Sequence, residues 1–169
     1  MQILETERLT LRHLVSDDLD ALSRLYRDPE IRRYFPDGTL TREETREEIE
    51  WFVHGHPEHP ELGLWATVLK ENGALIGRCG LLPWTIEDRF EIEVAYLIDK
   101  AHWGRGLGTE AALAVSRHAF ERLHVPRLIC LIHADHTASQ RVARHIGMAH
   151  EKDVVDEFGP SCVYAMAAP

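Results

Sequence analysis

Three glycines alternate with other residues in the stretch Trp103-Gly104-Arg105-Gly106-Leu107-Gly108. Glycine lets the backbone come close to a ligand, and the first N–H groups of a helix find no acceptor within that helix. An apolar run at 94–98 precedes the glycines, and positions 112, 115, 119 and 123 are apolar at helical spacing after them. The stretch therefore predicts a strand, a turn and a helix whose N-terminus binds an anion such as a phosphate, to which Arg105 would add positive charge.

The spacing of these glycines excludes two nucleotide-binding motifs. A dinucleotide-binding turn reads G-x-G-x-x-G and opens its domain, whereas G-x-G-x-G occurs here late in the chain, with only about sixty residues after it. The P-loop sequence G-x-x-x-x-G-K-S/T does not occur.

Two carboxylates, Glu91 and Glu93, lie on the predicted strand before the turn. Side chains alternate across a strand, so both are expected on the same face. A carboxylate in that place would act as a general base toward an amine, directly or through water, and Glu93 is the candidate. The alternative is that both are solvent-facing or ion-paired side chains without a chemical role.

Cysteine and metal chemistry are not indicated. Cys79 and Cys130 fall in apolar strand runs, where cysteine behaves as a small apolar side chain, and with Cys162 they form no paired motif. The three histidines of the loop 54–60 lie beside two prolines and lack the fixed spacing of a structural metal site. We expect Cys79 and Cys130 in the core, no disulfide framework and no metal.

The elements that position these groups follow from periodicity and turn residues. Ser16 or Asp17 is expected to cap the first helix, Thr41 and Glu44 form a capping box for the second, and an Asn-Gly pair at 72–73 predicts a hairpin. The expected order is a strand at 8–12, helices ending near Pro29 and at 53, strands at 64–70, 74–82 and 90–98, the helix after the glycines, a strand at 127–132, a helix at 137–145, and strands at 149–156 and 162–166 joined through Phe158-Gly159-Pro160. This order predicts a mixed α/β fold.

Composition limits the class of protein. The 169 residues fit one domain, 1–169, whose core we expect at about 8–167. Hydrophobic residues make up 44% and charged residues 28%, as in an ordinary soluble protein. A net charge of -9 disfavours nucleic acid and favours cationic partners. The charged N-terminus is unlike a signal peptide and no apolar run has the length of a membrane span, so a cytoplasmic location is expected.

These residues resemble the GNAT superfamily of acyl-CoA-dependent N-acyltransferases over nearly the whole chain. The superfamily turn reads Q/R-x-x-G-x-G/A, and 103–108 matches it except that Trp103 takes the first place. The Rim-type ribosomal-protein N-terminal acetyltransferases (RimJ/RimL) tolerate tryptophan there and are similar to this chain at EVAYL (93–97) and WGRGLGTEA (103–111). Segments 6–12, 138–142 and 146–148 extend the resemblance to both ends of the chain.

The resemblance implies a mixed sheet that splays beside its central strand, with acetyl-CoA as the acetyl donor. The acceptor would be a primary amine, either a protein N-terminal α-amine or a small cationic amine such as a polyamine or an antibiotic; a non-catalytic acyl-CoA-binding regulatory module is the alternative. A monomer or a homodimer is expected. The cofactor-binding residues implied are Tyr96 and Ile98 at the pantetheine arm, the amides of Trp103, Gly104, Arg105, Gly106, Leu107, Gly108 and Thr109 at the pyrophosphate, and His136 and Ser139.

The acid of the reaction is implied by the same resemblance. Many superfamily members place a tyrosine acid on the helix after the fourth-motif strand, and that position here is Ala143. Rim-type members instead have a serine three places after an asparagine; this chain keeps Ser139, while His136 replaces the asparagine. Ser139 would then lie nearest the departing sulfur, and an imidazole nitrogen would replace the amide contact to pantetheine. The alternative is a helix cap, for which Thr137 is the better placed of the two hydroxyls.

Overall fold

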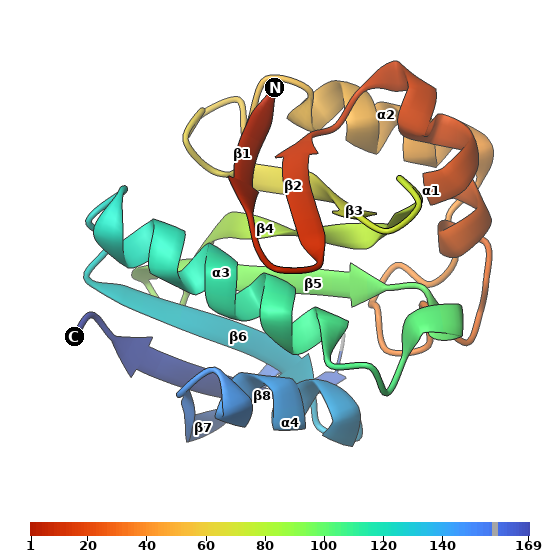
Figure 1. Cartoon of the computed structure of the whole chain (residues 1–169). Coiled ribbons are helices and arrows are strands. Elements are labelled where there is room, and N and C mark those ends of the chain that lie inside the picture. The colour runs from red at the N-terminus through yellow and green to blue at the C-terminus, as the bar shows by residue number, and fades with distance from the viewer. Residues whose placement is uncertain (157–158) are drawn as a thin grey trace.

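The computed structural model describes residues 1–156 and 159–169, and a single eight-stranded sheet runs through it (Figure 1). The strand order is β1-β2-β3-β4-β5-β6-β8-β7, antiparallel throughout except between β5 and β6. The strands are β1 Gln2–Glu5, β2 Leu9–His13, β3 Gly63–Leu69, β4 Leu75–Ile86, β5 Arg89–Ile98, β6 Arg127–His133, β7 Ala149–Asp156 and β8 Gly159–Ala167. The helices are α1 Leu19–Tyr26, α2 Arg42–Phe52, α3 Leu107–Glu121 and α4 Thr137–His145, with short 3-10 turns at Ser16–Asp18 and Lys100–His102. The predicted mixed α/β class is confirmed.

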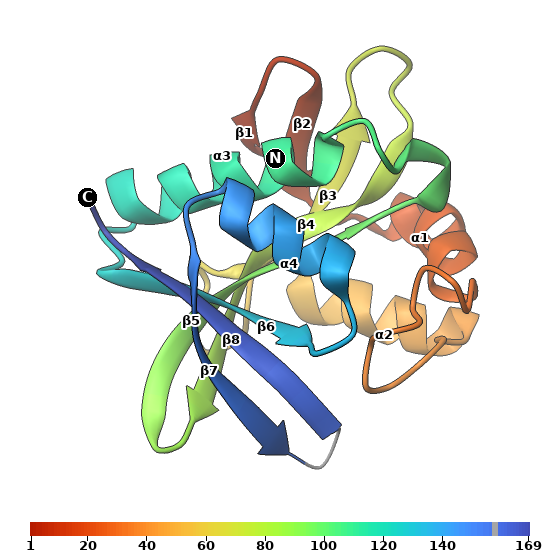
Figure 2. The same ribbon diagram turned by 90° about the horizontal axis from the view of Figure 1, so that it is seen from below.

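Helices cover both faces of the sheet. α3 and α4 lie side by side on one face, and α1 and α2 lie together on the other (Figure 2). Because side chains alternate along β5, Val94 and Ile98 are buried in the core beneath α3, whereas Ala95 and Leu97 are buried in the core beneath α1 and α2. Groups on successive residues of β5 therefore reach opposite sides of the molecule.

The two strands at the centre of the sheet separate after a short contact. Among the described residues, β5 and β6 share one register pair, Glu93 with Ile129. From there the strands diverge toward their carboxyl ends, which is the end where α3 begins (Figure 1). The splayed central sheet implied by the sequence resemblance is thus present.

Local sequence signals account for most element boundaries. The Thr41 hydroxyl accepts a hydrogen bond from the Glu44 N–H, and the Glu44 carboxylate accepts one from the Thr41 N–H, as the capping box predicts. Gly73 has a φ of 72° in the β3–β4 hairpin, which glycine adopts at little cost. Glu87 and Asp88 also have positive φ, at 48° and 63°, and make the tight turn between β4 and β5.

Three expectations differ from the structure. A first strand, β1, pairs with β2 although no signal in residues 2–5 indicated it. Neither Ser16 nor Asp17 caps α1; a short 3-10 turn precedes the helix, and Asp18 there accepts the Val15 N–H. In the predicted last turn, Phe158 lies outside the described residues and Gly159 already belongs to β8.

In the described part of the chain, no helix is long and apolar enough to cross a membrane.

Candidate active site

The glycine turn between β5 and α3 has the geometry that its sequence predicts. Gly104 and Gly106 have φ of 75° and 74°, and Gly106 stands at the N-terminus of the helix without a side-chain cap. The helical ladder begins with the Glu110 N–H donating to the Gly106 carbonyl at 3.0 Å. The N–H groups of residues 107–109 are therefore left without an acceptor in the helix, and a 15-residue helix directs the positive end of its dipole to the same place. These donors fit a phosphate group.

Arg8, at the start of β2, holds this turn in place. Its Nε donates to a Glu110 carboxylate oxygen at 2.6 Å and its Nη1 donates to the Arg105 carbonyl at 2.9 Å. The backbone N–H of Arg8 and the hydroxyl of Thr6 donate to the other oxygen of the same carboxylate. Periodicity does not single out these residues, which lie about a hundred positions apart; the only sequence signal is that 6–12 belongs to the resemblance.

The side chains of Arg105 and Trp103 in the glycine turn contact other residues of the protein. Arg105 is exposed and its guanidinium contacts the His102 ring at 3.0 Å, with Glu71 at 3.9 Å. The Trp103 indole Nε1 donates to the Ile98 carbonyl at 2.8 Å. Tryptophan in the first place of the motif thus ties the turn to the end of β5, and it takes one of the two backbone groups of Ile98 that were expected to hold pantetheine.

The free edge of β5 offers the remaining backbone groups. The Asp99 N–H donates to the carbonyl of Ile76 on β4, and alternate residues of an antiparallel strand bond to the same neighbour. The backbones of Val94, Tyr96 and Ile98 therefore point to the β6 side, and the Cys130 thiol reaches the Val94 carbonyl from there at 3.3 Å. Beyond the single pair with β6, this edge leaves the backbone of Tyr96 and the N–H of Ile98 for a ligand.

Glu91 and Glu93 have different environments despite their common face. Glu91 is 6% exposed and pairs with Arg127 at 3.1 Å and Arg89 at 3.3 Å, so it is an ion-paired carboxylate. Glu93 is half-buried and accepts the Trp84 indole N–H at 2.6 Å. Burial raises the pKa of Glu93 to about 7, and the hydrogen bond from Trp84 lowers it by less. A carboxyl group of this pKa exchanges protons near neutral pH.

Ser139 meets a tyrosine from the central strand. The Tyr96 hydroxyl lies 2.9 Å from Ser139 Oγ and donates to the Ser139 carbonyl at 2.9 Å. Burial holds the pKa of Tyr96 well above its usual value, so the phenol stays protonated. The residue before α4 is His136, and no side chain caps the helix there, so the alternative that Thr137 or Ser139 is a helix cap is wrong. The hydrogen bonds between Tyr96 and Ser139 join α4 to β5 where β5 and β6 separate.

His136 is turned toward an aromatic neighbour. Its ring stacks on Tyr34 with centroids 4.4 Å apart, and Tyr34 also lies 5.3 Å from the ring of His133. Burial lowers the pKa of His136 to about 4, so the imidazole is neutral. The loop between α1 and α2 is thereby fastened to the start of α4. Tyr34 had no signal in the sequence, because it lies in a loop without periodicity.

Two of the three cysteines, Cys79 on β4 and Cys130 on β6, are core residues, whereas Cys162 on β8 is partly buried. Cys79 and Cys130 are at most 1% exposed, and burial raises the pKa of the Cys79 thiol to about 12. A thiol that does not ionise near neutral pH is a poor nucleophile. No disulfide links the cysteines.

Comparison with known proteins identifies the family. Residues 8–149 match the model of the acetyltransferase (GNAT) domain, and the chain belongs to this family. An uncharacterized Bacillus subtilis protein, YkkB, is 32% identical over 95% of this chain and 93% of its own. A GNAT-family acetyltransferase from Bacillus anthracis has the same fold, with a TM-score of 0.85 at 22% identity over 99% of both chains. RimL, a ribosomal L7/L12 α-N-protein acetyltransferase solved with coenzyme A, has a TM-score of 0.81 at 18% identity over 99% of this chain and 98% of its own.

Proposed function

We propose that this chain transfers an acetyl group from acetyl-CoA to a primary amine, and that the amine is the α-amine of a peptide or protein N-terminus. The observation that supports it is the placement of two protonatable groups on either side of the splay. Glu93 points to the face covered by α1 and α2, and Ser139 with Tyr96 lies on the face covered by α3 and α4. A thioester between the strands would have a proton acceptor on one side and a proton donor on the other.

The cofactor is assigned to the turn and the strand edge. Acetyl-CoA would place its pyrophosphate at the amides of 103–109 and its pantetheine beside the backbone of Tyr96 and Ile98. The Ile98 carbonyl already accepts the Trp103 indole, so its N–H is the group that remains. His136 would contact the pantetheine through an imidazole nitrogen, and its stacking on Tyr34 would hold the ring in place.

The reaction needs two proton transfers and no covalent intermediate. The amine nitrogen attacks the thioester carbonyl carbon, the C–S bond breaks, and the amine proton passes to Glu93 directly or through water. The Ser139 hydroxyl gives a proton to the departing sulfur and regains one from solvent, while Glu93 releases the amine proton to solvent. The Tyr96 hydroxyl beside Ser139 orients that donor. The pKa of about 7 at Glu93 suits an α-amine, whose pKa is near 8, better than a lysine side chain near 10.4.

A panel of acceptors tests the assignment. Release of CoA thiol from acetyl-CoA is measured with a peptide that has a free α-amine, with the same peptide blocked at its N-terminus but containing lysine, and with a polyamine. We expect kcat/KM to be highest for the free α-amine. Preference for the polyamine would replace the acceptor by a small cationic amine. Tight acetyl-CoA binding without thiol release from any acceptor would support a non-catalytic binding module instead.

A further inference from the structure

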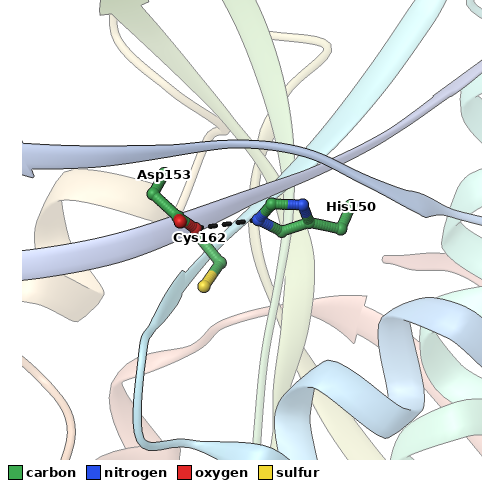
Figure 3. Close-up of side chains that lie close together, drawn as sticks. All are labelled: His150, Asp153 and Cys162. Carbon is green, nitrogen blue, oxygen red and sulfur yellow. Dashed lines mark hydrogen bonds and ion pairs between the residues drawn. The ribbon is translucent and has the colours of Figure 1, made fainter.

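The two strands at the C-terminal edge of the sheet bring together three side chains of the types that bind transition metals. His150 and Asp153 come from β7 and Cys162 comes from β8, and one ligand atom of each lies within 4.8 Å of the other two. The three side chains converge on one side of the hairpin (Figure 3). In residues 1–156 and 159–169, no other group of three or more histidines, cysteines and acidic residues lies this close.

A β-bulge in β7 makes this convergence possible. Residues three apart on a regular strand point to opposite faces, so His150 and Asp153 should be separated. The register, however, pairs His150 with Tyr164 and Lys152 with Val163, so Glu151 is an extra residue in β7. Asp153 then pairs with Cys162, which is two places from Tyr164 and thus on its face. A bulge re-aims the side chains that follow it, and here it aims the carboxylate at the histidine.

The bulge is held by a charged side chain from the neighbouring part of the sheet. Arg127 donates from both terminal nitrogens to the two Glu151 carboxylate oxygens, at 2.7 Å each. Its Nε meanwhile contacts buried Glu91 on β5. A bidentate arginine–carboxylate pair has a defined geometry. It therefore holds the extra residue Glu151 in place, and with it the neighbouring side chains of β7.

Tyr164, which packs against His150, is itself held by hydrogen bonds. The ring of Tyr164 packs edge-on against His150, with centroids 5.5 Å apart. Its hydroxyl accepts from Arg144 at 2.7 Å and donates to Gln140 at 3.2 Å, both on α4. The His150 ring therefore stands on a side chain that is itself fixed, as the ligands of metal sites commonly do.

We propose that His150, Asp153 and Cys162 bind a zinc ion, with water as the fourth ligand. Imidazole, carboxylate and thiolate are all zinc ligands, and the thiolate favours zinc over magnesium or calcium. Tetrahedral zinc with bonds of about 2.0–2.3 Å separates its ligand atoms by about 3.3–3.8 Å. His150 Nε2 and Asp153 Oδ1 lie 2.8 Å apart in a hydrogen bond, and all three ligand atoms lie within 4.8 Å of one another. Zinc would replace that hydrogen bond, with the imidazole proton on Nδ1, and side-chain rotations would set the spacing. On binding, the metal replaces the Cys162 thiol proton, which passes to solvent. No sequence motif indicated the site, because a hairpin register and a bulge create it.

A metal at this site would connect the edge strand β7 to its neighbour β8. β7 is the last strand of the sheet, and β8 is its only paired neighbour among the described strands. A metal bound by both strands fastens β7 to β8 at this edge of the sheet. Since the ligands exist together only in the folded hairpin, the metal raises the melting temperature, by an amount that grows with the logarithm of the ratio of free metal to Kd.

Cobalt(II) is the probe, because tetrahedral cobalt bound to a thiolate has intense visible bands and a sulfur-to-cobalt charge-transfer band. The full-length protein is dialysed against a chelator and then titrated. We expect one cobalt per chain, displacement by zinc, and a melting temperature that rises with zinc. Cys162→Ser should abolish the charge-transfer band, and His150→Ala should weaken binding at least about tenfold, roughly the loss that removal of one metal-site partner causes.

His59→Ala is the matched control, since it removes a histidine from the loop that carries three of them, and its titration should equal that of the parent. A parent that binds no cobalt, or a Cys162→Ser protein that binds it unchanged, overturns the proposal. So does loss of binding in His59→Ala with retention in Cys162→Ser. If Cys162→Ser does not fold by circular dichroism, exposed Asp153→Asn decides: unchanged cobalt affinity overturns the proposal, and at least about tenfold weaker binding supports it.

Discussion

At the scale of single residues, environment separates two carboxylates that the sequence pattern treats alike. Glu91 and Glu93 share a strand face, yet two arginines neutralise the first and an indole N–H contacts the second. Within the described part of the chain, no ion pair within 4.0 Å is recorded for Glu93. Burial makes the ionised form of Glu93 costly and raises its pKa to about 7, so this carboxyl group takes up and releases a proton near neutral pH.

Replacing Glu93 by glutamine should remove the general base while keeping a side chain of nearly the same size and shape. We expect parental kcat/KM to rise with pH through about 7 and the Glu93→Gln protein to lose roughly a hundredfold in kcat, the low end of acid–base catalysis. The loss should be deepest above about pH 7, where the parental carboxylate is ionised and can accept the proton, and it should shrink at low pH, where that carboxylate is protonated. A pH–rate profile from 6 to 9 measures this, with unchanged acetyl-CoA affinity as the control. A variant profile that overlies the parental one would make the side chain structural.

The same substitution has a stability signature of defined sign. The pKa of Glu93 is raised in the folded protein, so between about 4.5 and 7 the folded state holds a proton that the unfolded state has released. Parental stability should therefore fall as pH rises through this window, relative to Glu93→Gln, which does not titrate. Melting temperatures of both proteins at pH 5 and pH 8 test it. A difference that is the same at both pH values contradicts the raised pKa.

The Ser139 hydroxyl should affect turnover more than stability. Ser139→Ala removes one hydrogen bond to Tyr96, whose hydroxyl keeps the Ser139 carbonyl as a partner. Because CoA thiol is a good leaving group, we expect turnover to fall by roughly tenfold to a hundredfold. Tyr96→Phe should lower kcat as well and add little on the Ser139→Ala background, since it acts through the serine. A lower melting point with parental turnover in Ser139→Ala would exclude the role as acid.

At the scale of elements, local signals predicted most of what local interactions create. The capping box of α2 and the bounds of α4 were readable because each depends on residues a few positions apart. The Arg8–Glu110 pair and the Tyr96–Ser139 pair were not, since they join residues 102 and 43 positions apart through sheet register. Likewise, Tyr34 and the bulge at Glu151 follow from packing and pairing, which periodicity does not encode.

The glycine turn gives a test at this scale. Gly106→Asp would set a negative charge beside the free amides of α3, and acetyl-CoA affinity should fall at least about tenfold because anion binding there is electrostatic. Aspartate tolerates the left-handed φ of 74° better than most residues, so the fold should survive. Gly106→Asn has the same shape without the charge and should lose less. Equal calorimetric affinity of parent and Gly106→Asp would contradict the phosphate assignment.

At the scale of the whole molecule, the chain has a net charge of -9, while its proposed donor is an anion. Acetyl-CoA is therefore attracted locally, by the N-terminus of α3 and the guanidinium of Arg8, although the net negative charge of the chain repels it. A cationic acceptor experiences the opposite, because the whole surface attracts it. Long-range attraction of this kind depends on ionic strength, whereas contacts within the site depend on it much less.

Salt should consequently distinguish acceptors by charge. Raising ionic strength from about 0.01 M to about 0.15 M shortens the screening length from about 30 Å to about 8 Å. We expect KM for a peptide with lysines after its free N-terminus to rise roughly three- to tenfold, as the attraction of the -9 chain is screened. The same peptide with glutamates in place of the lysines should show a KM that falls. Steady-state kinetics at saturating acetyl-CoA measure both, and parallel changes for the two peptides would assign the salt effect to the donor site or to the fold instead of to the acceptor's charge.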